Sequence, residues 1–156
     1  MDAKQKLTFQ LELLFWLFTV ILIVAFAYPI YKTGAPFPFY LMLGLFIVVF
    51  VTLTRYIFLM KYTFLAFNKW AKAVLIAVSI PFIFFLIGEL NTFQTFYDEE
   101  GLDQFFRFLP LIERLDLQKY IRAIMLFFGT GAIIAAIIFP FRLMISIWRN
   151  FNRASS

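Results

Sequence analysis

Four long apolar runs occupy nearly half of the 156 residues, and none contains a charged side chain. They extend over residues 13–30, 37–54, 73–88 and 123–141. An apolar stretch of about 18 residues is long enough to cross a bilayer as a helix. In lipid, every backbone N–H and C=O group must be bonded within the segment, which favours helices. The sequence therefore predicts an all-α membrane protein with four transmembrane helices.

The limits of the spans follow from the flanking polar residues. We expect one domain over residues 1–156, with spans at about 8–31, 38–60, 70–90 and 120–148. Lys4 and Lys6 precede the first run, and Ala25-Phe26-Ala27 has the small-residue pattern of a signal-peptide cleavage site. The apolar run is long and continues beyond this triplet. We therefore interpret the first run as an uncleaved helix.

The absence of His and Cys removes many kinds of chemistry. It excludes disulfides, haem ligation by His, iron–sulfur clusters and ordinary zinc sites. Neither a Ser-His nor a Cys-His nucleophile can be assembled, and there is no glycine-rich phosphate loop. We therefore expect no cofactor, no metal site and no catalytic activity.

The net charge of +5 comes from basic residues beside the apolar runs, so it does not indicate nucleic-acid binding. Basic loops remain on the cytoplasmic side of a membrane. Basic residues gather near both chain ends and between the second and third runs: Lys4, Lys6, Arg55, Lys61, Lys69, Lys72, Arg142, Arg149 and Arg153. We expect both termini to be cytoplasmic, in a multi-pass protein of a bacterial inner membrane.

The connection between the third and fourth runs is long and unusually apolar. Its residues Leu102, Phe105, Phe106 and Leu109 have the spacing of one helix face. This pattern predicts an amphipathic helical segment within about residues 92–118, which would lie in the membrane interface, cap the bundle or dock on a partner. The acidic residues 98–103 lack the alternating ligands of a calcium loop, so we interpret them as a solvated turn.

Charged residues at the ends of the runs suggest two polar clusters. Glu12, Arg55 and Arg142 fall at similar depth on the inner side, and we expect Glu12 to pair with one of the two arginines. Glu89 ends the third run and Arg122 opens the fourth, so we expect an outer ion pair. Alternatively, the arginines extend to the headgroups and have no further role.

The fourth run contains closely spaced small residues: Gly129, Gly131, Ala132, Ala135 and Ala136. Small residues four apart allow the backbones of two helices to approach closely. The partner helix is either another span of this chain or another subunit.

These features favour a non-catalytic membrane subunit, anchor or assembly factor of a larger complex. Its partners would be the lipid bilayer and either a membrane protein or further copies of the chain, and not nucleic acid. A small transporter, channel or lipid-handling protein is the alternative, with Glu12, Arg55 and Arg142 as an anion or headgroup site. An enzyme acting on lipid at the outer acidic segment has the least support.

Overall fold

The computed structural model describes residues 3–60 and 69–154, and the long elements in these ranges are α-helices. Helix α1 covers Ala3–Tyr31, α2 covers Tyr40–Leu59, α3 covers Lys69–Glu99 and α4 covers Leu111–Ala154. A short 3-10 helix, η3, covers Asp103–Phe105. Each of the four α-helices is long and apolar enough to span a membrane. The prediction of an all-helical chain with four candidate spans is therefore confirmed.

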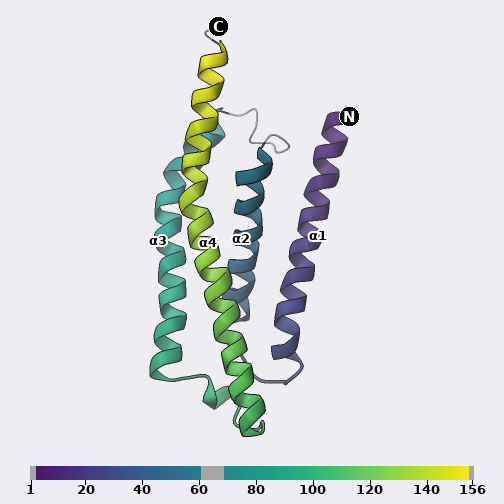
Figure 1. The fold of residues 1–156 in the computed structure, drawn as a ribbon, viewed down its shortest axis with the longest axis vertical. Helices are drawn as coiled ribbons and strands as arrows, with labels where there is room; N and C mark the ends of the chain where they lie inside the picture. Colours follow the sequence, from purple (N-terminus) through teal and green to yellow (C-terminus); the bar gives the residue numbers. More distant parts are fainter. Residues whose placement is uncertain (1–2, 61–68, 155–156) are drawn as a thin grey trace.

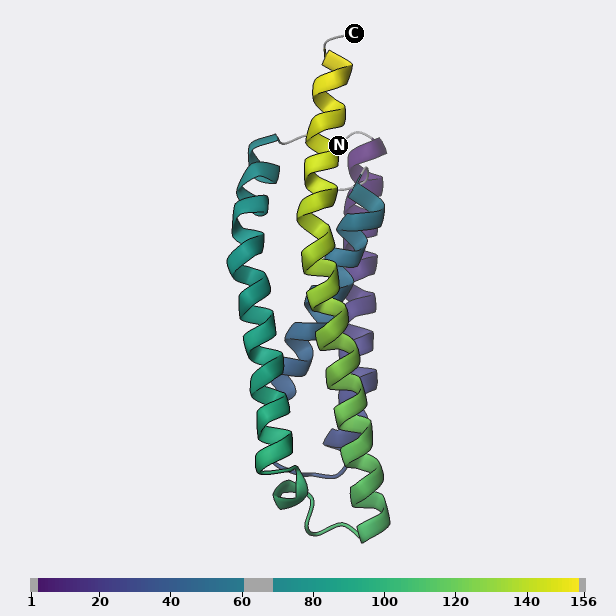
Figure 2. The ribbon, with the colours of Figure 1, turned by 60° about the vertical axis from the view of Figure 1, so that its left-hand side comes forward.

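The four helices lie alongside one another and alternate in direction (Figure 1). Both termini lie at one end of the bundle, which we call the terminal end. The connections 32–39 and 100–110 lie at the opposite end, which we call the hairpin end. Helix α4 packs against both α2 and α3, whereas α1 packs chiefly against α2 (Figure 2). Helix α4 is therefore the central element of the bundle.

Glycine ends the helices at the two hairpin connections. Gly34 and Gly101 both have φ of 70°, in the left-handed region where a side chain is disfavoured. The Gly101 N–H donates to the Phe96 carbonyl at 3.0 Å, a bond typical of a helix C-terminus. Pro110 directly precedes α4, where its missing N–H leaves no helix hydrogen bond unmade.

Residues from all four helices meet at one level of the bundle. The rings of Phe26 on α1 and Phe128 on α4 lie 4.9 Å apart, centroid to centroid. A Cβ atom added at Gly129 would lie 2.7 Å from Leu90 Cδ1 on α3 and 3.2 Å from Phe46 Cε2 on α2. We call this the Gly129 level. It sets the relative heights of the four helices.

Large apolar side chains cover much of the bundle's exterior. On α1 the exposed ones include Leu13, Leu17 and Val24, and on α3 and α4 they include Phe84 and Phe127. Exposed apolar surface of this extent is unfavourable in water and marks contact with lipid or protein. The exterior is compatible with a multi-pass membrane protein.

The predicted amphipathic helix between the third and fourth spans is not formed. Helix α3 continues to Glu99 and α4 begins at Leu111, so most of residues 92–118 belong to these two helices. Between them η3 is only three residues long. Leu102 and Phe106 are fully buried in the core, and Phe105 and Leu109 pack partly against it. The connection packs on the end of the core, which agrees with the expected alternative of a bundle cap, but it does so without forming the predicted helix.

Candidate functional site

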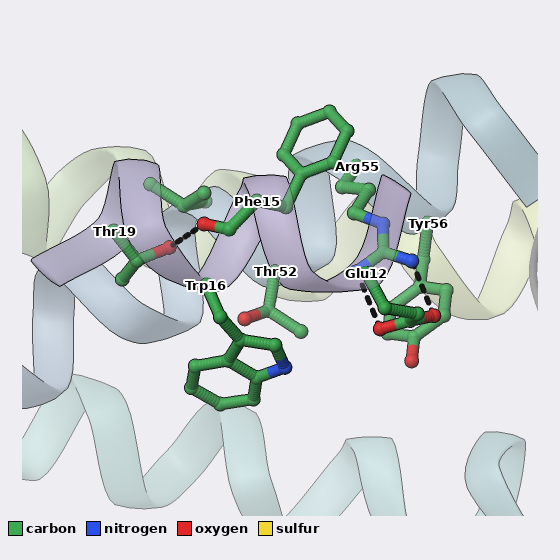
Figure 3. Close-up of a pocket in the computed structure, with 8 residues that line it drawn as sticks. Glu12, Phe15, Trp16, Thr19, Thr52, Arg55 and Tyr56 are labelled. Atoms are coloured by element: carbon green, nitrogen blue, oxygen red, sulfur yellow. Dashed lines mark hydrogen bonds and ion pairs between the residues drawn. The ribbon is translucent and has the colours of Figure 1, made fainter. Parts of the chain in front are cut away.

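Glu12 of α1 forms an ion pair with the buried Arg55 of α2, and the Glu12 side chain is itself partly buried (Figure 3). Arg55 Nη1 donates to Glu12 Oε2 at 2.8 Å, and Arg55 Nη2 faces Glu12 Oε1. The Arg55 side chain is 5% exposed and the Glu12 side chain 17%. A planar guanidinium that contacts both carboxylate oxygens gives the strongest and most directional form of this pair.

Aromatic rings enclose the pair. The Arg55 Cζ atom lies 5.0 Å from the centre of the Phe15 ring and 5.6 Å from that of Tyr56. Phe15 lies one helical turn from Glu12 on the same face of α1, and Tyr56 adjoins Arg55 in the chain. Contacts of a cation with ring faces stabilise a charge that has been removed from water. The aromatic residues that pack against the ion pair are therefore close neighbours of its two charged residues in the sequence.

A small cavity adjoins the ion pair. It has a volume of about 30 Å³, and its walls include Trp16, Thr19 and Thr52 beside the charged residues (Figure 3). The Thr19 hydroxyl is satisfied within its own helix, because it donates to the Phe15 carbonyl at 2.8 Å. Since a water molecule needs about 10–15 Å³ of such space, the cavity has room for about two waters. It is too small for a larger substrate.

Arg142, the third member of the predicted inner cluster, does not join this pair. Its Nε atom donates to the Ile57 carbonyl of α2 at 3.0 Å. Ile57 lies two residues beyond Arg55, so Arg142 lies nearer the terminal end. The structure therefore brings Glu12 and Arg55 together and uses Arg142 to join α4 to the end of α2.

The predicted outer pair of Glu89 and Arg122 is not formed. Within the described residues neither side chain makes an ion pair, and Arg122 instead places its guanidinium 5.0 Å from the centre of the Tyr97 ring. The heights of the helices give the reason. Glu89 adjoins Leu90 and so lies at the Gly129 level, whereas Arg122 is seven residues, or about 11 Å, closer to the hairpin end.

The small residues of α4 are used within the chain. Gly129 accommodates Leu90 and Phe46, and a Cβ atom at Gly131 would lie 2.9 Å from the Phe50 ring. Ala132, Ala135 and Ala136 are buried in the same chain. The sequence left open whether this face contacts a helix of the same chain or of another subunit, and the structure shows contact within the same chain. The close partners of this face are α2 and α3.

A buried contact between Lys72 and Ser146 was not predicted. Lys72 was assigned to the basic central loop, but its side chain is fully buried in α3, and Nζ donates to Ser146 Oγ on α4 at 3.0 Å. Lys61, another residue assigned to that loop, lies outside the described residues. The sequence carried a signal, since Lys72 precedes the buried Ser79 and Leu86 at seven-residue intervals on one helix face.

A second unpredicted feature is a polar stripe on the outward face of α3. It consists of Gly88, Asn91, Thr92 and Thr95, which recur at helical spacing and are all exposed. The buried residues Leu86, Leu90 and Phe93 lie on the opposite face of the helix. We call these four residues the α3 polar stripe.

The stripe lies at a height where α1 and α4 expose large apolar side chains, although α4 also exposes the Thr130 hydroxyl there. Asn91 and Thr92 follow Leu90 directly and so begin at the Gly129 level. Near that level α1 exposes Val24 and α4 exposes Phe127. The stripe gathers several hydrogen-bonding side chains on one helix face, where unpaired polar groups are unfavourable in contact with lipid tails.

No protein-family model, curated protein or solved structure matches this chain.

Proposed function

We propose that this chain is a non-catalytic subunit of a membrane complex, and that a transmembrane helix of a different protein binds the α3 polar stripe. The observation that supports this is the exposure of Asn91, Thr92 and Thr95 near the Gly129 level, where Val24 and Phe127 are apolar. Asparagine and threonine side chains bind neighbouring helices in membranes through hydrogen bonds, and glycine allows close approach. The Thr92 hydroxyl donates to the Gly88 carbonyl at 2.9 Å, so it would serve a partner helix as an acceptor. Gly88 has open space around its Cβ position, so a partner backbone has room beside it.

Charge favours a different protein over a second copy. The stripe leads into the acidic residues Asp98, Glu99 and Glu100 at the hairpin end, and all three are exposed. Two copies that paired in parallel through α3 would place these carboxylates side by side, which is unfavourable. A partner helix with hydrogen-bonding side chains and basic residues at that end would complement both features.

The membrane and the orientation are part of the same proposal. We assign the chain to a bacterial cytoplasmic membrane with both termini in the cytoplasm, on the basis of the basic residues near its ends. The alternative of a small transporter needs a passage for its substrate. The cavity beside Glu12 and Arg55, at about 30 Å³, gives that alternative little support.

The proposal is tested by site-directed photo-crosslinking in the native membrane, followed by mass spectrometry. A crosslinking amino acid at position 92 should capture one membrane protein in a fixed ratio. The same group at position 24 or 127, near the same height, should not. The triple variant Asn91→Leu, Thr92→Val, Thr95→Val should lose the captured protein from the purified complex while it retains the bundle's helical content.

Other results would contradict the proposal in different ways. Crosslinks between identical chains at position 92 would show that the stripe binds a second copy of this chain and not a different protein. Equal capture at positions 24, 92 and 127 would indicate random membrane neighbours. A partner that remains bound to the triple variant would remove the stripe as its binding surface.

A further inference from the structure

A cavity of about 210 Å³ lies between α3 and α4 at the hairpin end of the bundle. From α3 it is lined by Phe93, Gln94, Tyr97 and Asp98, and from α4 by Arg122 and Leu126. Its walls are mixed in character. Phe93 and Leu126 are apolar and lie toward the Gly129 level, whereas Asp98 and Arg122 are charged and lie toward the hairpin end.

Arg122 is held in a defined position at this cavity. Its guanidinium carbon lies 5.0 Å from the centre of the Tyr97 ring, a cation–π contact between α4 and α3. Within the part of the chain that the structure describes, the N–H groups of Arg122 make no hydrogen bond or ion pair. A guanidinium presents these donors in a planar fork that fits phosphate oxygens.

Asp98 supplies the opposite charge without neutralising Arg122. Within the described residues, neither side chain makes an ion pair with the other or with a third residue. Nearby, Arg114 and Asp103 do pair, at 3.3 Å, so oppositely charged groups meet at this end where they are within reach. The cavity therefore presents separated positive and negative groups.

The height of Arg122 corresponds to the end of the α2 span. Arg122 precedes Gly129 by seven residues, and Phe39 and Tyr40 precede Phe46 by about the same number on the parallel helix α2. In a membrane this is where the apolar core gives way to headgroups. The charged part of the cavity lies at headgroup height, and its apolar part lies nearer the hydrocarbon.

We propose that this cavity binds the headgroup of a zwitterionic phospholipid of the phosphoethanolamine class. The Arg122 guanidinium binds the lipid phosphate, and the Asp98 carboxylate binds the ammonium group. Phe93 and Leu126 contact the start of the acyl chains. A purely anionic headgroup would satisfy Arg122 but would leave Asp98 without a cation, so the pair of charges selects the zwitterion.

The experiment is native mass spectrometry of the purified full chain with phosphatidylethanolamine or phosphatidylglycerol added at matched concentrations. The wild type should retain phosphatidylethanolamine in preference to phosphatidylglycerol. Arg122→Gln should weaken retention roughly tenfold to a hundredfold, the range for loss of a charged hydrogen-bonding partner. Asp98→Asn should abolish the preference between the two lipids. Arg107→Gln, which removes an exposed charge at the same end, should change neither result.

Two further measurements keep the outcome clear. Circular dichroism shows whether each variant remains folded, and Arg122→Lys, which retains the cation, should bind more lipid than Arg122→Gln. Equal retention of both lipids by the wild type, or unchanged binding by Arg122→Gln, would overturn the proposal. Displacement of the lipid by an equal concentration of soluble glycerophosphoethanolamine would also overturn the proposal. That result would show that the cavity binds a soluble zwitterion and not a lipid.

Discussion

The Arg55 guanidinium contacts both oxygens of the Glu12 carboxylate and so joins α1 to α2 inside the bundle. Arg55 lies four residues from the end of α2, which places the pair about 6 Å inside the span. Removing two charges from water is costly, and the cost is offset only when the pair is well formed and its surroundings are favourable. Here the two-point contact and the Phe15 and Tyr56 rings provide that compensation.

If the pair serves only to hold α1 in place, its effect on stability should depend on both charges together. Arg55→Met should lower the free energy of unfolding by about 1–3 kcal/mol, because the partly buried Glu12 is left without a partner. The double variant Glu12→Leu, Arg55→Met should recover most of this loss. Thermal unfolding in mild detergent measures both. A double variant as unstable as the single one would contradict this explanation.

The hydrogen bond from Lys72 to Ser146 predicts a difference between two buried serines. Ser146→Ala removes an acceptor of the buried Lys72 ammonium and should cost about 1–3 kcal/mol of stability. Ser79→Ala is the matched control, because Ser79 Oγ donates only to the Leu75 carbonyl of its own helix. The control should change stability little. Similar unfolding temperatures for the two variants would show that the bond to Lys72 contributes nothing.

Gly129 and Gly44 predict opposite effects for the same substitution. A Cβ atom at position 129 would lie 2.7 Å from Leu90 Cδ1, so Gly129→Ala must displace a buried side chain and should destabilise the bundle by about 1–3 kcal/mol. At Gly44 nothing lies within 4 Å of the Cβ position, so Gly44→Ala should be neutral or stabilising by up to about 1 kcal/mol. Chemical denaturation in detergent compares the two. Equal losses would show that α4 does not depend on this close approach.

The helices were predictable because each one depends on a local pattern. Four long apolar runs are sufficient to identify four candidate spans. The pairing of Glu12 with Arg55 could also be predicted, since the two residues lie four and five residues inside the terminal limits of their predicted spans, at residues 8 and 60. The choice between Arg55 and Arg142 could not, because it depends on the rotation of α4 about its axis and on its height.

The errors at the hairpin end have a common physical cause. The apolar run of the third span ends near Gly88, but α3 continues for eleven residues to Glu99. The end of hydrophobicity was therefore a poor marker of the end of the helix, and Glu89 was placed too near the surface. The spacing of Leu102, Phe105, Phe106 and Leu109 suggested a helix, although their burial comes from the folding back of a connection.

The predicted orientation, with both termini in the cytoplasm, rests on fewer basic residues once the structure is considered. Arg55 and Lys72 are buried side chains, so they no longer count as loop charges. The other basic residues near the terminal end still favour a cytoplasmic location for that end. Because the chain has no Cys, single-cysteine variants report each end separately. In intact cells, a membrane-impermeant maleimide should label Phe108→Cys at the hairpin end, and should label Asn152→Cys only after permeabilisation. The reverse pattern would invert the proposed topology.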